Sequence, residues 1–347
     1  MNSEKILQKF QILSKPARLP SKKKILDAAR KALFVLATES SSYRERIPGT
    51  DIPGGLLDFR KEPLLTIVVP DIHARPDFIY NILNFVLPKN SSGLERNVKV
   101  IDALEGDLAR LVLVGDILHA EGREKERWLR AWNEFDKGTD DSSFMRAEMR
   151  EGLVALLAVM EAKALWPKNF HCLKGNHENI KNERGGGNFP FRKFASEGQM
   201  VLAFMRSAYD EEVLNAIYDF EKTLPLAFCA KNLFVSHAEP LEFFSKEELL
   251  LAPVDERIVY GLTWTANNEA RVGGVEKILA ALCEPSAKIE PRAIGGHRPV
   301  PENYLERQGG LYVQIHNPNK QNVALVRPDK TFNPKKDIIS VIGDKNG

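Results

Sequence analysis

Residues 170–178, FHCLKGNHE, join a β-rich run to a cluster of chemically active side chains. The first four residues form a short apolar run bounded by polar residues, which predicts a buried β-strand. Gly175 then allows a sharp turn, because glycine has no Cβ atom. Asn176, His177 and Glu178 follow directly, although no packing requirement explains them there. We interpret the stretch as a strand that delivers metal or proton chemistry at its carboxyl end.

Four other β-rich runs end in similar residues. Their motifs are Asp71-Ile72-His73 after LLTIVVP, Gly115-Asp116 after LVLV, His237 after LFVS and Gly295-Gly296-His297 after RAI. In open α/β sheets ligands bind at the carboxyl ends of the strands, because the loops converge there. Aspartate, histidine and asparagine side chains together suit Mn, Fe or Zn. A pair of ions about 3.5–4 Å apart needs a bridging ligand. A carboxylate bridges best, and Asp116 is the natural candidate.

Helical patterns lie between the β-rich runs, and this alternation is typical of an α/β fold. A helix is expected from Ser21 to about Glu39, followed by a polar connector. Trp128 and Trp132 lie four residues apart in a long helical stretch, a spacing typical of core or cap packing. We expect an N-terminal helical extension with its connector (1–60), a main domain (61–330) with a helical insertion at about 120–166, and a C-terminal tail (331–347).

Composition excludes several classes of protein. The chain has 347 residues, of which 43% are hydrophobic, so disorder is excluded as its main state. A net charge of +2 gives no field that favours nucleic acid, and the basic run at 21–24 is interpreted as a solvated helix start. No apolar run approaches 18 residues, so we expect no membrane span. The three widely spaced cysteines indicate a reducing compartment. A cytoplasmic protein is therefore expected.

The order of the motifs resembles the calcineurin-like metallophosphoesterase superfamily, and within it the phosphoprotein phosphatase (PPP) branch. The superfamily pattern is D-x-H, G-D, G-N-H-[DE], H and G-H, and this chain has DIH, GD, GNHE, SHAE and GGH in that order. GLTWTANN at 261–268 and VQIHNPN at 313–319 are similar to two further segments of the branch, L-x-W-S-D-P and F-S-A-P-N. The resemblance covers about Leu64 to Arg327. It implies a four-layer αββα sandwich with two divalent metal ions.

The resemblance also implies a role for each motif residue. Asp71 and His73 would bind the first metal, Asp116 would bridge, and the second metal would be bound by Asn176, His237 and His297. In such a two-metal mechanism, a water bound and deprotonated by the cations attacks phosphorus. His177 would act as the general acid that protonates the departing alkoxide.

The chain departs from the PPP pattern G-D-x-V-D-R-G, which is replaced by Gly115-Asp116-Ile117-Leu118-His119-Ala120-Glu121. The aspartate that orients the acid histidine is replaced by His119, and a phosphate-binding arginine by Ala120. We expect other arginines to replace the lost phosphate contact, because a guanidinium offers phosphate a bidentate fork. The candidates are Arg271, Arg75 and Arg298. His119 and Glu178 are expected to support the ligands from behind, whereas His171 and His316 are expected to be structural.

Three functions remain open. The first is a manganese-stimulated phosphatase that acts on a phosphomonoester, such as phosphoserine or phosphothreonine in a protein. The second is hydrolysis of a dinucleoside polyphosphate or another nucleotide, since bacterial diadenosine tetraphosphatases resemble the same branch and read H-A-G where this chain has His237-Ala238. The third is a non-catalytic module that retains the metal cage. The motifs do not identify the metals, the oligomeric state or whether the phosphoester is a small molecule or a protein.

Overall fold

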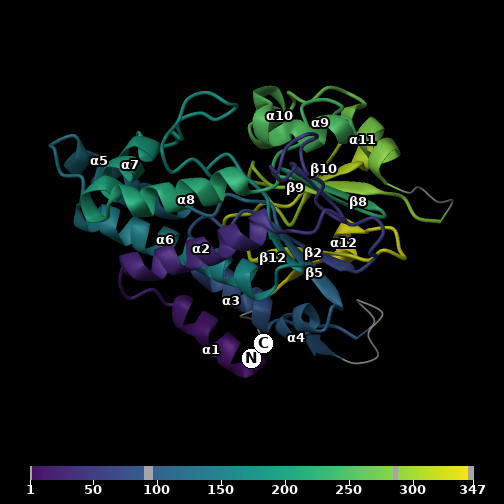
Figure 1. Cartoon of the computed structure of the whole chain (residues 1–347), viewed down its shortest axis with the longest axis horizontal. Coiled ribbons are helices and arrows are strands. Elements are labelled where there is room, and N and C mark those ends of the chain that lie inside the picture. The colour runs from purple at the N-terminus through teal and green to yellow at the C-terminus, as the bar shows by residue number, and fades with distance from the viewer. Residues whose placement is uncertain (1, 90–96, 284–287, 343–347) are drawn as a thin grey trace.

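Two β-sheets lie at the centre of the computed structural model, which describes residues 2–89, 97–283 and 288–342 (Figure 1). The six-stranded sheet has the strand order β1 (Leu56–Asp58), β7 (Ala227–Ala230), β8 (Leu233–Ser236), β9 (Arg292–Gly295), β11 (Tyr312–Gln314), β10 (Leu305–Arg307). The five-stranded sheet has the order β13 (Ile338–Ser340), β12 (Asn322–Val326), β2 (Leu65–Val69), β5 (Ala109–Leu113), β6 (Phe170–Cys172). A short antiparallel ladder joins β3 (Val86–Leu87) to β4 (Val98–Lys99).

Parallel pairing aligns the strand ends that carry the sequence motifs. In the five-stranded sheet, β2, β5 and β6 run parallel, with Leu65 opposite Ala109 and Leu111 opposite Phe170. In the six-stranded sheet, β8, β9 and β11 also run parallel. Each group of three strands therefore presents its carboxyl ends at one edge of its sheet, as the sequence predicts.

Alternating side chains divide the interior into layers. Val68 and Val112 face the other sheet and pack with Val235 and Ile294 in the core between the sheets. Their neighbours on the same strands, such as Ile67, point to the opposite face and pack against helices. Side chains alternate in this way because successive residues of a strand face opposite sides of the sheet. The two sheets thus share one apolar layer and each has a helical cover.

Helices cover both outer faces, and Figure 1 shows the two sets on opposite sides of the sheets. The set on the five-stranded sheet comprises α1 (Ser3–Leu13), α2 (Lys22–Ala37), α3 (Pro76–Asn84), α4 (Val100–Glu105), α5 (Lys125–Phe135), α6 (Ser143–Leu165), α7 (Glu197–Ala208) and α8 (Glu211–Thr223). The set on the six-stranded sheet comprises α9 (Lys246–Leu251), α10 (Glu256–Thr263) and α11 (Gly274–Leu282). The expected four-layer αββα arrangement is confirmed.

The structure contains the helix expected from Ser21 and the helical insertion. The Ser21 side chain accepts a hydrogen bond from the Lys24 amide at the start of α2. In the helical insertion, Trp128 is fully buried and its Nε1 donates to the Ala120 carbonyl at 2.7 Å. Among the described residues, no helix combines the length and the apolar character needed to cross a bilayer.

Two strands lie outside the limits expected for the main domain. β1 belongs to the predicted N-terminal extension, yet it pairs in parallel with β7. β13, with the short α12 (Pro334–Asp337) before it, belongs to the predicted tail, yet it pairs with β12. The boundaries at 60 and 331 therefore cut segments that share a sheet with the main domain. Three-residue strands of this kind carry too short a pattern to be located by periodicity.

Candidate metal centre

The six residues expected to bind metal converge where the carboxyl ends of the two sheets meet. They are buried, none being more than 8% exposed, and the His177 side chain lies among them. Their ligand atoms form overlapping groups, in each of which all atoms lie within 4.8 Å of one another: Asp71, His73 and His316; His73, Asp116 and His177; Asp116, His237 and His297. The ends of six strands, β2, β5, β6, β8, β9 and β11, thus contribute to one cluster, and Asp116 belongs to two of its groups.

The backbone that carries these ligands is strained. His73, Asp116 and His297 have φ angles of 43°, 50° and 66°, in the left-handed region that favours glycine. Such conformations cost about 1–3 kcal/mol each and persist only where the surrounding structure imposes them. Here the Asp116 carbonyl accepts hydrogen bonds from the amides of Ile72 and His73, at 3.1 and 2.7 Å, so the first two motifs hold each other in place.

Gly175 is required for close approach rather than for a left-handed turn. A Cβ atom on Gly175 would lie 2.2 Å from Oδ1 of Asp116, and one on Gly115 would lie 2.5 Å from the Gly175 amide nitrogen. Of the two, only Gly115 has a positive φ, at 111°. The two glycines therefore let the loops after β5 and β6 touch, which brings Asn176 and His177 next to Asp116.

One side of the cluster has too few protons for its polar atoms. His237 Nδ1 lies 3.1 Å from the Val114 carbonyl and must donate its proton there, which leaves Nε2 with a lone pair. That Nε2 lies 3.0 Å from Asn176 Oδ1 and 3.2 Å from His297 Nδ1, and the latter two atoms are 2.9 Å apart. Three converging atoms share at most one proton. A cation between them satisfies all three, so these residues fit a metal ion.

On the other side of the cluster, His73 likewise has a nitrogen that faces the cluster. His73 Nδ1 lies 2.9 Å from the His119 carbonyl, and its Nε2 has no hydrogen-bond partner among the described residues. That free nitrogen lies 3.7 Å from a carboxylate oxygen of Asp71 and of Asp116. The carbonyl keeps one proton on Nδ1. Burial opposes a charge on His73, but Glu121, Asp71 and Asp116 outweigh it and raise the pKa of His73 to about 9, so the position of Nε2 favours a positive charge. This set also fits a divalent cation.

Buried negative charge at the centre of the cluster also favours a bound cation. Burial raises the pKa of Asp116 well above its ordinary value, and the nearby charges of Asp71 and Glu178 add to this rise. The Glu178 carboxylate accepts from the amides of Gly175, Asp116 and Ile117 at 2.6, 2.9 and 2.8 Å. Glu178 thus fixes both ligand loops from behind. A divalent cation near the carboxylates of Asp71 and Asp116 would offset this buried negative charge.

His316 lies inside the cluster, although the sequence interpretation left it outside as a structural residue. It follows β11 and is fully buried, with Nδ1 3.6 Å from Asp71 Oδ2. The rule that located the other ligands, a histidine behind a strand, would have found it too. His171 instead lies within β6, where its Nδ1 is 3.4 Å from a Glu39 oxygen, remote from the cluster.

His177 is held by its backbone and by aromatic packing. Its amide donates to Asp116 Oδ1 at 2.9 Å, and its ring centroid lies 3.7 Å from that of Phe191 and 5.1 Å from that of His119. Among the described residues, Nδ1 has no hydrogen-bond partner. Burial lowers the pKa of His177 well below its ordinary value, with His73 and His119 adding to the effect. Within the described residues, the His177 ring is therefore held by packing against Phe191 rather than by a hydrogen bond to Nδ1.

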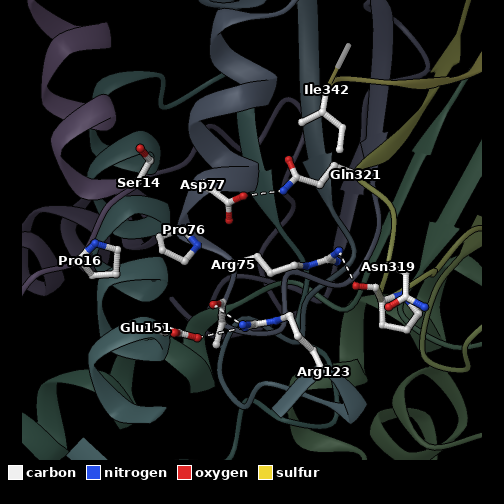
Figure 2. A pocket seen from close by; sticks show the side chains of 12 residues that line it. Ser14, Pro16, Arg75, Pro76, Asp77, Arg123, Glu151, Asn319, Gln321 and Ile342 are labelled. Atoms are coloured by element: carbon white, nitrogen blue, oxygen red, sulfur yellow. Dashed lines mark hydrogen bonds and ion pairs between the residues drawn. The ribbon is translucent and has the colours of Figure 1, made fainter. Parts of the chain in front are cut away.

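The three candidate phosphate-binding arginines lie in different parts of the structure. Arg75 is buried, and its guanidinium donates to the carbonyls of Asp71 and Lys320 at 2.6 and 2.9 Å. Figure 2 shows it directed toward the segment that carries Asn319, beside a cavity of about 430 Å³. Arg271 is exposed and pairs with Glu242. Neither guanidinium is directed at the metal cluster, which corrects the expectation for these two.

Arg298 does lie at the site. It lines a cavity of about 130 Å³ together with Asn176, His177 and His297. The same cavity is lined by Arg192 and Lys193, which sequence reasoning missed because no strand or motif precedes them. The segment from Pro190 to Lys193 therefore covers one side of the site, with the Phe191 ring against His177.

Comparison with known proteins supports the fold. A protein serine/threonine phosphatase from Saccharomyces cerevisiae, described as similar to human phosphatase PP5, aligns with a TM-score of 0.56 and 13% identity, over 98% of this chain and 95% of that one. A cold-active protein-tyrosine phosphatase from Shewanella aligns at 0.42 with 11% identity, over 84% and 83% of the two chains. A putative diadenosine tetraphosphatase aligns at 0.39 with 15% identity, over 85% and 100%. The last two scores are too low to define a fold. No protein-family profile and no curated protein sequence matches the chain.

Proposed function

We propose that this protein is a metal-dependent phosphoester hydrolase, a phosphomonoesterase like the serine/threonine protein phosphatases. The observation that carries this proposal is the convergence of six ligands and His177 at the joint edge of two sheets, in a fold shared with a serine/threonine phosphatase. We assign Asp71, His73 and Asp116 to one cation. Asn176, His237 and His297, with Asp116 as the bridge, are assigned to the other.

The chain's own residues then perform the remaining chemistry. When bound, two divalent cations neutralise phosphoryl oxygens and make water more acidic. His177 would donate a proton to the oxygen that leaves phosphorus, and for this the negative charge of a bound phosphoester must raise the pKa that burial lowers. The hydrogen bond from its backbone amide to Asp116 Oδ1, 2.9 Å long, holds His177 next to Asp116. Phe191, only 7% exposed, excludes water from the ring of that acid. Arg298 provides positive charge at the cavity where the phosphate enters.

The proposal predicts that Asp116→Asn and His177→Asn abolish manganese-stimulated hydrolysis of phenyl phosphate by different routes. Asp116→Asn loses bound manganese, because an amide bridges two cations poorly. His177→Asn retains manganese but loses about 10²–10⁴-fold in kcat, the usual contribution of a general acid. Its loss is smaller with p-nitrophenyl phosphate, whose leaving group needs no proton. Steady-state kinetics and metal analysis measure both effects.

The exposed Arg271 provides a matched control, since its side chain pairs with Glu242 at the surface. Arg271→Gln keeps full activity and both metal ions. Undiminished turnover in both Asp116→Asn and His177→Asn would overturn the assignment. Two bound metal ions with no turnover on a broad panel of phosphoesters would establish a non-catalytic module instead.

A second candidate, hydrolysis of a dinucleoside polyphosphate, is favoured by one observation. The guanidinium-bearing Arg192 and Arg298 line the cavity beside His177, whereas Lys193 at the same cavity pairs with Glu121. Two arginines suit more than one phosphate group. Competition between a phosphopeptide and diadenosine tetraphosphate separates the candidates. A phosphomonoesterase shows the higher kcat/KM for the phosphopeptide.

A further inference from the structure

His316 has the geometry of a metal ligand. It is fully buried, and its Nδ1 has no hydrogen-bond partner among the described residues although it points into the cluster. Asp71 Oδ2 lies 3.6 Å from that nitrogen. The rings of His316 and His73 are 5.1 Å apart between centroids. A buried lone pair without a partner is costly unless something electropositive meets it.

Glu121 determines which nitrogen of His316 carries the proton. Its Oε2 lies 2.9 Å from His316 Nε2, and an ionised carboxylate only accepts hydrogen bonds. The proton is therefore on Nε2, and Nδ1 presents its lone pair to the cluster. His73 and His237 have the same arrangement, with a backbone carbonyl in place of the carboxylate. A histidine that donates one N–H to an oxygen is the usual form of a metal-binding imidazole.

We propose that His316 Nδ1 is a further ligand of the cation held by Asp71 and His73, and that Glu121 is its positioning residue. This inference rests on the proposed function. The resulting set of two imidazole nitrogens and two carboxylate oxygens, with Asp116 as the fourth member, suits Mn, Fe or Zn. It gives this cation as many protein ligands as the other.

Glu121 also joins this ligand to the segment that covers the acid. Its second oxygen pairs with Lys193 Nζ, and Lys193 lies two residues after Phe191, which packs on His177. The Glu121 carboxylate is 5% exposed and the Lys193 side chain 35%, so the pair connects the buried cluster to the open side of the cavity. A single carboxylate therefore links the tautomer of His316 to the position of the Phe191 ring.

Metal binding tests the inference without reference to turnover. The wild-type chain should bind two Mn²⁺ per molecule by calorimetry and elemental analysis, and Co²⁺ should give a d–d absorption spectrum for each site. His316→Asn should weaken one of the two sites by at least tenfold and change the spectrum of that site alone. His171→Asn, at another buried histidine that faces a glutamate, should keep both sites.

The positioning role of Glu121 needs its own variants. Glu121→Leu should weaken the same site about 10–100-fold, the usual cost of losing the partner of a ligating histidine. Glu121→Gln keeps a hydrogen-bond acceptor for Nε2 and should restore most of the affinity and the Co²⁺ spectrum. Melting curves recorded without metal check that each variant is folded.

These measurements distinguish failure of the His316 inference from failure of the proposed function. If His316→Asn folds and binds two Mn²⁺ with unchanged affinity and an unchanged Co²⁺ spectrum, this inference is overturned while the proposed function stands. If the wild-type chain binds no divalent cation, both are overturned.

Discussion

At the scale of single residues, His119 contacts the cluster both through its backbone carbonyl and through its side chain. Its carbonyl accepts from His73 Nδ1 at 2.9 Å, so it fixes the tautomer of a metal ligand. Its ring stacks on Phe191, with centroids 4.6 Å apart, and neither ring nitrogen has a hydrogen-bond partner among the described residues. Burial lowers the pKa of His119 to about 3, so the ring is neutral. The His119 side chain therefore holds the His177 ring in place by packing.

We expect His119→Asn to keep both metal ions and to lower kcat on phenyl phosphate. Asparagine tolerates the φ of 67° at this position and retains the carbonyl that orients His73. The smaller side chain leaves the ring of His177 less firmly held, and a small misplacement of a catalytic group costs about 10²-fold in rate. Steady-state kinetics and metal analysis measure the two effects. An unchanged kcat would refute this positioning role of the His119 side chain, and so would loss of metal.

At the scale of elements, a buried ionic network ties the N-terminal extension to the main domain. Glu39, just after α2, contacts Arg44 Nη1 and Lys163 Nζ, each at 2.6 Å. Lys163 lies on α6 and also donates to the Phe170 carbonyl of β6 at 3.1 Å. All three charged side chains are at most 2% exposed. The loop that carries Asn176 therefore begins at a strand that this network fixes.

We expect Glu39→Gln to lower the free energy of unfolding by about 3–5 kcal/mol, because two buried cations lose their counter-charge. Burial opposes ionisation of Glu39, but the charges of Lys163 and Arg44 outweigh it and hold its pKa well below the ordinary 4.5. Its contribution is therefore complete above about pH 4.5 and is lost as the pH falls further. Urea unfolding at several pH values measures both effects.

The control for this network is the surface pair of Arg30 and Glu212, whose side chains are 64% and 51% exposed. Arg30→Gln changes stability by less than about 1 kcal/mol, as is usual for exposed ion pairs. Equal losses in Glu39→Gln and Arg30→Gln would contradict the argument, as would a Glu39→Gln variant with the acid sensitivity of the wild type.

At the scale of the whole molecule, the cluster joins the two sheets. Asp71, Asp116 and Asn176 follow strands of the five-stranded sheet, whereas His237 and His297 follow strands of the six-stranded sheet. Bound cations would therefore add further links between two layers that already share an apolar core and hydrogen bonds such as that from His237 Nδ1 to the Val114 carbonyl. The unfolded chain has no such assembled site, so metal binding adds to stability.

Removal of metal should therefore lower the melting temperature. Manganese at 100 times its dissociation constant adds about 2.7 kcal/mol to the stability of the folded state. Melting curves with EDTA and with increasing manganese measure this shift. Asp116→Asn is the control and should respond little. A shift of equal size in Asp116→Asn would mean that manganese acts elsewhere.

Local patterns determined much of this protein. The β-rich runs and the helical patterns between them predicted an α/β fold, and Ser21 predicted the start of a helix. The four layers were implied by the family that the order of the motifs resembles, and the motifs predicted which residues meet at the strand ends. These features depend on residues close in sequence, because strand period, capping and tight turns are local. The ligands are predictable for the same reason, since each directly follows its strand.

Only the tertiary structure decided what the long side chains and the isolated residues do. Arg75 reaches carbonyls of the segment near Asn319, and Arg271 pairs at the surface, whereas Lys193 reaches Glu121. His316 enters the cluster because β11 pairs beside β9. Such partners lie far apart in the chain, and flexible side chains adopt the rotamer that packing and charge leave open. No local pattern carries that information, so the folded chain alone determines it.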